Sequence, residues 1–415
     1  AGAVEYEVVM RAFDEADSLA GLIAEDRLTH EHVRSVARRL ASFHHKAPAV
    51  QGGGVREVGE MWARNVRELM EAQPPADWYV DVAEGFGAAF LRAHEREVRR
   101  RQRDGLVRDG HGDLRCEHVL AVPVVRVVDR VEFDPALRRT DVACDLAFLA
   151  MDLEARGCHW AAVDLVEAYR REGMSPGSDA LQAFYAAYRA IVRAKVALIA
   201  AAEHRGDAGA REAGLGEAQA LWDLAETLCW RARRPLALIV CGPAASGKST
   251  LAGELARRTG MALLSSDLVR KAAAGVAPSE RAAPEHYSEL FTHATYELLG
   301  REAEQALARE RGVIVDATCR SHAARELLLG GLQRAGLTWL AVRCRAPLAV
   351  ASERAARRMG QAGHVSDATP QIVAEHYRTF QELSELPSES VIELDTQRPL
   401  DVQVAEVARA VDGRL

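Results

Sequence analysis

A glycine-bearing loop in the second half of the chain constrains the fold most strongly. Residues 242–249 read Gly-Pro-Ala-Ala-Ser-Gly-Lys-Ser and fit the spacing G-x-x-x-x-G-K-[ST]. The loop follows an apolar run at 236–241, which we expect to be a β-strand, and it precedes a segment with helical spacing that ends near Arg258. A strand, such a loop and a helix in this order predict a phosphate-binding P-loop, and an ordinary glycine turn is the alternative.

The residue types in this loop suit a bound triphosphate. Backbone N–H groups have to approach the phosphates closely, and Gly242 and Gly247 lack the Cβ atom that would prevent it. Lys248 would place its charge near the β- and γ-phosphates, and the Ser249 hydroxyl is a predicted magnesium ligand. We therefore expect ATP and Mg²⁺ as cofactors. The predicted nucleotide-binding residues are Gly242, Ala245, Ser246, Gly247, Lys248, Ser249 and Thr250.

Strands and helices alternate through the rest of the region 236–415. This alternation predicts an α/β domain in which a parallel sheet carries helices on both faces. The further strands that we expect lie at 261–265, 313–316, 337–344 and 391–394. The further helices that we expect lie at 284–311, 323–335, 347–359, 370–383 and 400–411.

Two acidic residues follow predicted strands of this domain. Asp316 ends a strand and is a predicted magnesium-positioning acid, although a carboxylate that caps the next turn would look the same. Asp267 follows the second strand, where ligands of such sheets bind, and is a predicted general base for a hydroxyl. Arg270 comes one helical turn later and would hold an anionic part of the acceptor. A helix cap with a surface arginine is the alternative for this pair.

A basic segment at 353–370 lies where small kinases carry a lid. Arg354, Arg357 and Arg358 have i, i+3 and i+4 spacing, so they share one face of a helix. Arginines at this place neutralise charge on a transferring phosphoryl group, and a solvated helix face is the alternative. Residues 394–397 are a weaker candidate for the border of the adenine site.

With these motifs, the region from Leu236 onward resembles the P-loop small-molecule kinases related to gluconate kinase, zeta toxins and the phage-type polynucleotide 5′-kinase. The resemblance implies that Asp267 is the general base, that Arg270 binds the acceptor, and that Arg354 and Arg358 contact phosphates. It implies a hydroxyl-bearing acceptor, either a small molecule or the 5′ end of a nucleic acid, and it does not choose between them.

Residues 1–230 have a different pattern, which is mostly helical, and the basic cluster before Pro235 marks the predicted boundary. Thr29 is a predicted N-cap, and we expect helices at 55–70, 81–103 and 179–203 and a strand at 124–133.

The segment 111–120 of this part reads His-Gly-Asp-Leu-Arg-Cys-Glu-His-Val-Leu. A hydroxyl kinase needs a carboxylate near the acceptor and a second acid on magnesium, and Asp113 and Asp129 would supply them. Two solvent-facing acids are the alternative. With Asp145-Leu-Ala downstream, the segment resembles the aminoglycoside phosphotransferase-like family, which has the fold of protein kinases. The resemblance implies that Asp113 is catalytic, that Asp129 binds metal and that Asp145 braces the catalytic loop.

Two departures from that family weaken this second site. His118 occupies the place of a metal-binding asparagine, and imidazole is a poorer magnesium ligand than an amide oxygen. The run 4–10 resembles the strand at the hinge between the two kinase lobes, so the glycine-rich loop and the ATP-pairing lysine would precede Ala1. We therefore expect a kinase-like C-lobe that lacks most of the nucleotide lobe and binds acceptor or regulates its neighbour.

Composition excludes several other classes of protein. A net charge of -7 argues against bulk nucleic-acid binding, and the 7 cysteines lack C-x-x-C spacing, which predicts reduced thiols. The sequence shows neither a signal peptide nor an apolar run long enough for a bilayer, so we expect a cytoplasmic protein with no membrane partner. The leading hypothesis is an ATP-dependent phosphotransferase. An ATP-gated regulator and an antibiotic-modifying phosphotransferase are the alternatives.

Overall fold

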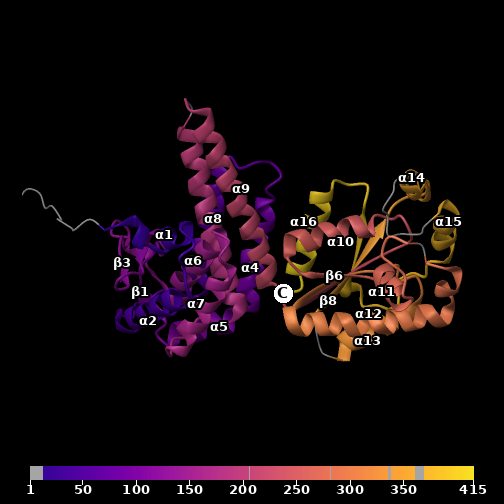
Figure 1. The fold of residues 1–415 in the computed structure, drawn as a ribbon, viewed down its shortest axis with the longest axis horizontal. Helices are drawn as coiled ribbons and strands as arrows, with labels where there is room; N and C mark the ends of the chain where they lie inside the picture. The colour runs from indigo at the N-terminus through magenta and orange to yellow at the C-terminus, as the bar shows by residue number, and fades with distance from the viewer. Residues whose placement is uncertain (1–12, 205, 281, 335–337, 360–368) are drawn as a thin grey trace, which may run out of the picture. The chain divides into compact units, whose positions relative to one another are not determined.

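The computed structural model describes residues 13–204, 206–280, 282–334, 338–359 and 369–415 (Figure 1). The chain forms two compact units. The first comprises Ala1–Pro74 and Leu91–Leu228, and the second comprises Pro75–Phe90 and Cys229–Leu415. The strand predicted at 4–10 lies outside the described residues.

The first unit is mostly helical, as the sequence predicts. Its helices are α1 (Leu19–Ala24), α2 (His30–Lys46), α3 (Val55–Glu71), α5 (Glu95–Arg103), α6 (Val142–Ala155), α7 (His159–Arg171) and α8 (Asp179–Glu203). Two further helices, α4 (Val80–Ala93) and α9 (Ala208–Ala232), belong in part to each unit. Two short antiparallel pairs complete it, β1 (Val107–Asp109) with β4 (Arg139–Asp141) and β2 (Val119–Leu120) with β3 (Arg126–Val127).

Local sequence explains where these elements begin and end. Thr29 caps α2 as predicted, because its side chain accepts the N–H of His32 at 3.3 Å. Two predictions are wrong in extent. The helix expected at 81–103 is interrupted at His94, whose backbone (φ −105°, ψ 13°) leaves the helical region. The strand expected at 124–133 is only β3, because Asp129 has a φ of 60° and turns the chain.

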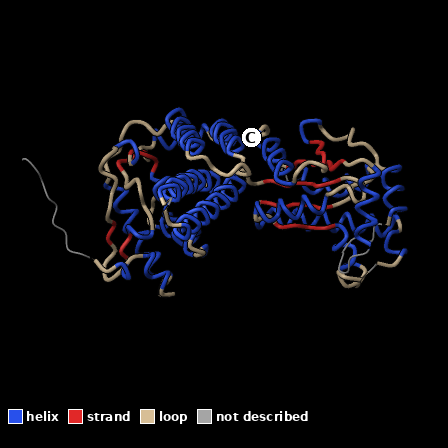
Figure 2. Tube along the Cα trace, turned by 90° about the horizontal axis from the view of Figure 1, so that it is seen from above, coloured by secondary structure: helices blue, strands red, loops and turns tan. Residues whose placement is uncertain are grey.

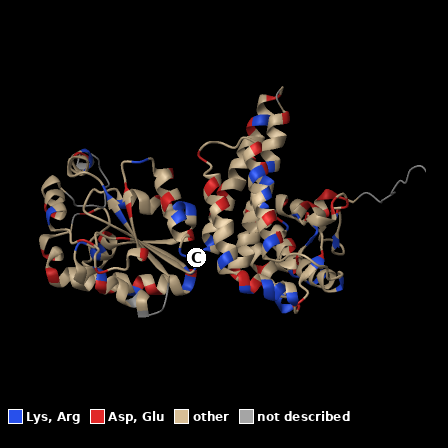
Figure 3. Ribbon diagram, turned by 180° about the vertical axis from the view of Figure 1, so that it is seen from behind, with Lys and Arg blue, Asp and Glu red and all other residues tan. Residues whose placement is uncertain are grey.

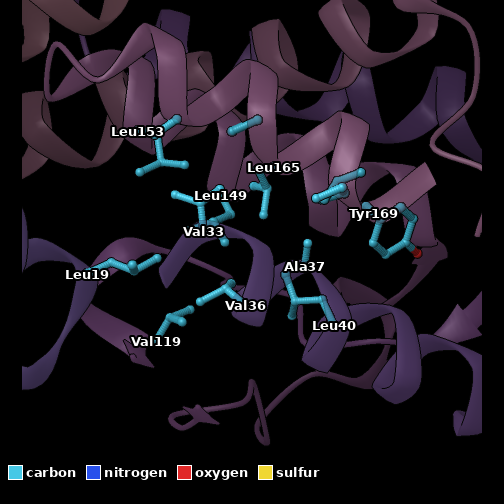
Figure 4. Close-up of a cluster of buried hydrophobic side chains, with 14 of the residues drawn as sticks. Leu19, Val33, Val36, Ala37, Leu40, Val119, Leu149, Leu153, Leu165 and Tyr169 are labelled. Carbon is cyan, nitrogen blue, oxygen red and sulfur yellow. The ribbon is translucent and has the colours of Figure 1, made fainter. Parts of the chain in front are cut away.

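The core of the first unit lies among α1, α2, α6 and α7 (Figure 4). From α2 it takes Val33, Val36, Ala37 and Leu40, which recur at i, i+3, i+4 and i+7 and so form one apolar stripe. This core fixes the chain segment 114–121, which contributes buried Leu114, Cys116, Val119 and Ala121, and so it positions the loop that precedes them.

The second unit contains a five-stranded parallel sheet in the order β6-β7-β5-β8-β9. Its strands are β5 (Leu236–Cys241), β6 (Ala262–Ser265), β7 (Gly312–Asp316), β8 (Trp339–Arg345) and β9 (Val391–Asp395). Its helices are α10 (Lys248–Thr259), α11 (Ser266–Ala273), α12 (Glu289–Glu310), α13 (His322–Arg334), α14 (Leu348–Met359), α15 (Pro370–Thr379) and α16 (Leu400–Asp412). The helix expected at 284–311 starts later, because Ser288 caps α12 and a short 3-10 turn precedes it.

Helices cover both faces of this sheet, which confirms the prediction from the sequence (Figure 2). Alternate residues of β5 point to opposite faces. Ile239 packs in the cluster formed with α12 and α13, whereas Leu238 and Val240 pack in the cluster formed with α10 and α16. The central strand is therefore buried on both sides, as its continuous apolar sequence requires.

The segment Pro75–Phe90 joins the second unit through polar contacts at its start. The Tyr79 hydroxyl donates a hydrogen bond to Asp401 at 2.6 Å, and Arg409 donates to Asp81 at 2.7 Å. Farther along α4, the Arg233 guanidinium lies 4.5 Å from the centre of the Phe86 ring. The sequence pattern of 75–90 gives no sign of this attachment, because its partners lie at the other end of the chain.

Several bulk properties of the described residues bear on the expected class of protein. No described helix combines the length and the apolar character needed to cross a bilayer. All seven cysteines are free thiols, as predicted. Basic and acidic side chains are interspersed along the helices of each unit (Figure 3).

Candidate functional site

Three neighbouring strands of the second unit end at one level of the sheet. Val240 of β5 is the register partner of Asp316, the last residue of β7, and Asp316 is in turn the partner of Ser265, the last residue of β6. The P-loop begins just after Val240, and Asp267 follows shortly after Ser265. The carboxyl edge of the sheet therefore brings together the phosphate loop and both predicted acids, at the edge where ligands of such sheets bind.

The two glycines of the P-loop are required by its shape. Gly242 has a φ of 141°, and a Cβ atom there would lie 2.5 Å from the Cys344 carbonyl oxygen. Gly247 has a φ of 98°, and its Cβ atom would lie 2.9 Å from Cβ of Thr396. Ala245 also has a positive φ, 59°, an uncommon conformation for a residue other than glycine. The sequence positions that predicted close phosphate approach are thus the positions where the backbone has no room for a side chain.

Lys248 is buried at the start of α10, and its Nζ donates a hydrogen bond to the Pro243 carbonyl at 2.9 Å. An ammonium group has three donors, so this bond leaves capacity for a phosphate. The Ser246 hydroxyl is buried without a hydrogen-bond partner among the described residues, whereas Ser249 and Thr250 are exposed on the first turn of α10. The buried charge, the unsatisfied hydroxyl and the helix N-terminus fit a polyphosphate with its metal ion.

Thr396 ties the P-loop to two other elements. Its hydroxyl donates to the Ser246 carbonyl at 2.6 Å and accepts from Nη1 of Arg354 at 3.1 Å. Nη2 of Arg354 also donates to the Thr396 carbonyl at 2.8 Å. Arg354 is therefore held beside the P-loop by the loop after β9. The other two predicted lid arginines lie farther along α14: Arg357 pairs with Glu353 at 3.2 Å, and the side chain of Arg358 lies outside the described part of the chain.

The predicted acceptor residues lie on α11. Asp267 is half-buried in its first turn, and Arg270 is buried one turn later. Nη1 of Arg270 donates to the His286 carbonyl at 2.6 Å and lies 3.3 Å from the Thr292 hydroxyl, while its Nε has no partner among the described residues. Arg270 thus fastens the turn before α12 next to Asp267 and retains an unused donor.

Sequence reasoning missed two cationic or polar groups near this edge. Arg320 follows Asp316 by four residues, so its position after a strand is a signal that could have found it. His376 lies on α15, and the charges of Arg320 and Lys248 both act on its ring. Nothing in the local sequence of α15 singles out this histidine, because the contacts that bring it to the P-loop are long-range.

The second predicted site lies in the first unit, on the loop that follows β1. Asp145 is buried, and its carboxylate accepts the N–H groups of His111 at 2.5 Å and of Gly112 at 2.9 Å. Burial alone raises the pKa of the Asp145 carboxyl, but the hydrogen bond and charge of His44, 3.5 Å away, and these backbone donors lower it to about 2. Asp145 therefore stays ionised and holds this loop in place.

The acids Asp113 and Asp129 lie on either side of His118. Nδ1 of His118 is 3.6 Å from the Asp113 carboxylate, and its Nε2 is 3.3 Å from the Asp129 carboxylate. Arg115 donates from Nε to Asp113 at 3.1 Å. His118 thus lies beside both acids, Arg115 pairs with only Asp113 of the two, and the Asp129 side chain is largely exposed. In the described part of the chain, no group of three His, Cys, Asp or Glu side chains is arranged to hold a metal ion.

The sheet order and the loop together define a P-loop nucleotide-binding fold. Residues 238–383 match a family model described as an AAA domain, which covers the P-loop, both strand-end acids and the lid segment.

The comparison with curated proteins extends over nearly the whole chain. The chain is 30% identical over 387 residues to uncharacterized proteins of Mycobacterium tuberculosis and Mycobacterium bovis, covering 90% of this chain and 75% of each relative. The chain therefore belongs to the family of these mycobacterial proteins.

Solved kinases resemble the chain over less than half of its length. A gluconokinase from Sinorhizobium meliloti is 18% identical and covers 44% of this chain and 94% of its own, with a TM-score of 0.32. A sugar kinase from Janibacter is 20% identical, with coverage of 42% and 94% and a TM-score of 0.35. The APS kinase of Mycobacterium tuberculosis, in complex with AMPPNP and APS, is 21% identical, with coverage of 43% and 98% and a TM-score of 0.32. At these values the likeness bears on neither substrate nor mechanism.

Proposed function

We propose that the second unit is an ATP- and Mg²⁺-dependent phosphotransferase that transfers the γ-phosphate of ATP to a hydroxyl group. The observation that carries the proposal is the common level at which β5, β7 and β6 end. This level gives one sheet edge a phosphate loop, an acid suited to magnesium and an acid suited to a hydroxyl acceptor. A protein that only senses ATP has no need of the last of these.

We assign the binding of the phosphates and of magnesium to separate residues of the site. Lys248 and the backbone of the P-loop bind the phosphates, with contacts from Ala245, Ser246 and Thr250. Ser249 and Asp316 would hold Mg²⁺, which would supply positive charge against the charge of the phosphates. Arg354 and Arg358 add positive charge from the lid side.

On the acceptor side, Asp267 accepts the hydroxyl proton as that oxygen attacks the γ-phosphorus. The unused donor of Arg270 binds an anionic part of the acceptor. The acceptor is a small polyol, sugar or nucleotide, or the 5′-hydroxyl end of a nucleic acid. The first unit, which we infer to be an aminoglycoside phosphotransferase-like domain, binds acceptor or regulates its neighbour, with Asp113 and Asp129 at its centre.

The test is transfer of ³²P from [γ-³²P]ATP onto a metabolite extract and onto oligonucleotides with a 5′-hydroxyl end. Once a labelled product is identified, Asp267→Asn should reduce the rate of transfer on the order of a hundredfold, because base catalysis is lost. Its affinity for ATP should stay unchanged, since a general base acts on the acceptor hydroxyl and not on the nucleotide.

Glu304→Gln serves as the matched control, because it removes one carboxylate charge from an exposed position of α12. Full activity in a folded Asp267→Asn protein would exclude the general-base role. Absence of any labelled product, with ATP binding intact, would favour an ATP-binding regulator over an enzyme.

A further inference from the structure

We propose that His376, together with Lys248 and Arg320, binds the terminal phosphate of the bound nucleotide and so makes the site prefer a triphosphate to a diphosphate. The proposal rests on the function proposed above and assigns one more residue to the same site. His376 is not part of the P-loop, the strand-end acids or the basic segment of α14.

Two contacts position the helix that carries His376, and the first joins α15 to the P-loop. Val373 of α15 is fully buried in a small apolar cluster with Ala244 and Ala245, two residues of the loop itself. One turn later, Tyr377 packs against the same cluster and donates a hydrogen bond to the Ala346 carbonyl at 3.0 Å. This face of α15 is therefore packed against the phosphate loop, and a hydrogen bond ties it to the residue that follows β8.

The second contact joins α15 to Arg320, which lies beyond the end of β7. Nη1 of Arg320 is 3.4 Å from the Thr379 hydroxyl and 3.9 Å from the Glu375 carboxylate. His376 comes three residues after Val373 and three before Thr379, so it shares a helix face with both. His376 therefore lies on the side of α15 that carries the contacts with both the P-loop and Arg320.

The surroundings of the His376 ring leave one of its nitrogen atoms unsatisfied. Nδ1 of His376 is buried and has no hydrogen-bond partner within the described part of the chain. Burial, followed by the charges of Arg320 and Lys248, lowers the pKa of His376 to about 4, so the ring is neutral at physiological pH. A buried polar atom without a partner is unfavourable, and so is a buried cation such as Lys248. A phosphate oxygen between the three groups would satisfy all of them.

The geometry points to the terminal phosphate for a simple reason. Lysine in this loop position reaches the β- and γ-phosphates, and Arg320 follows Asp316, the acid at the magnesium side of the site. A group that shares the surroundings of both cations lies at the outer end of the polyphosphate chain. The neutral imidazole would donate a hydrogen bond to an oxygen of that phosphate.

The test compares two nucleotides by calorimetry in Mg²⁺ buffer, AMPPNP with its third phosphate group and ADP without one. His376→Ala should weaken the binding of AMPPNP about tenfold, as expected for one lost hydrogen bond to a charged group, and should leave the affinity for ADP unchanged. His376→Asn should restore most of the affinity for AMPPNP, because its amide nitrogen replaces Nδ1. His293→Ala is the matched control, because His293 is an exposed histidine of the same unit.

An equal loss of affinity for both nucleotides would overturn the proposal, because it would show that His376 only supports the fold. Unchanged affinity for AMPPNP in His376→Ala would overturn it as well. If that variant does not fold, the Asn variant decides, since it should retain the preference for AMPPNP over ADP. Failure of the wild-type protein to bind either nucleotide would contradict the proposed function itself, and the two failures are therefore distinguishable.

Discussion

Lys248 is a buried cation whose Nζ donates a hydrogen bond to a carbonyl of its own loop. In the described part of the chain, no carboxylate lies within ion-pair distance of its Nζ, so its desolvation is only partly offset. Such a group gains more from a bound phosphate than an exposed lysine would. This local imbalance explains why a single residue should control nucleotide binding.

We expect that Lys248→Ala abolishes the thermal stabilisation of the protein by ATP and Mg²⁺. In the wild type, ligand at 100 times its dissociation constant adds about 2.7 kcal/mol to the free energy of unfolding. A thermal melt with and without nucleotide measures this difference. Lys46→Ala, at an exposed position in the first unit, should keep the full stabilisation. The P-loop assignment would be wrong if Lys248→Ala kept it too.

At the scale of elements, Thr396 makes the loop after β9 part of the P-loop. Its hydroxyl bonds the Ser246 carbonyl and Nη1 of Arg354, so three elements converge on one side chain. Thr396→Val keeps the volume and removes these two hydrogen bonds and a third, which the hydroxyl donates to the Arg345 carbonyl at 3.1 Å. We expect the free energy of unfolding to fall by about 1–2 kcal/mol and the affinity for ATP to fall several-fold, because the Ser246 carbonyl loses its partner.

Urea denaturation and an ATP titration would measure the two effects of Thr396→Val. Thr338→Val makes the same chemical change at an exposed position and should be silent in both experiments. If Thr396→Val also left both quantities unchanged, the bonds of Thr396 would be a surface detail and not a support for the P-loop.

The elements that could be predicted are those whose signal lies within a few neighbouring residues. The P-loop is contiguous, so its residues were identified from the sequence, and the apolar run of β5 marked the central strand. The break at His94 could not be predicted, because the apolar spacing continues through it. His376 reaches the site through the packing of α15 on the P-loop, which no local pattern encodes, whereas Arg320 follows the end of a strand.

For the whole molecule, the two predicted sites differ in how far their charges are already compensated. This difference predicts how many nucleotides one chain binds. Arg115 and His118 already surround Asp113 in the first unit, whereas the P-loop of the second unit holds an incompletely compensated cation. We therefore expect one AMPPNP per chain in a calorimetric titration with Mg²⁺. Asp113→Asn should leave this number and the affinity unchanged, and Lys248→Ala should remove binding altogether.

A stoichiometry near two would contradict this expectation. So would residual tight binding in Lys248→Ala that Asp113→Asn then removes. Either result would mean that the first unit carries a working nucleotide site of its own.

The attachment of the segment Pro75–Phe90 to the second unit also bears on how the protein is made. The ribosome releases Tyr79 long before its hydrogen-bond partner Asp401, which follows 322 residues later. The Phe86 ring of α4 likewise lacks its contact with the Arg233 guanidinium until that residue has been synthesised. The start of α4 therefore lacks its partner at Asp401 until almost the entire remaining chain has been made. A protein cut at 231 would lack that partner permanently. Chaperones should therefore have to protect the nascent chain during this interval, because exposed apolar helices aggregate.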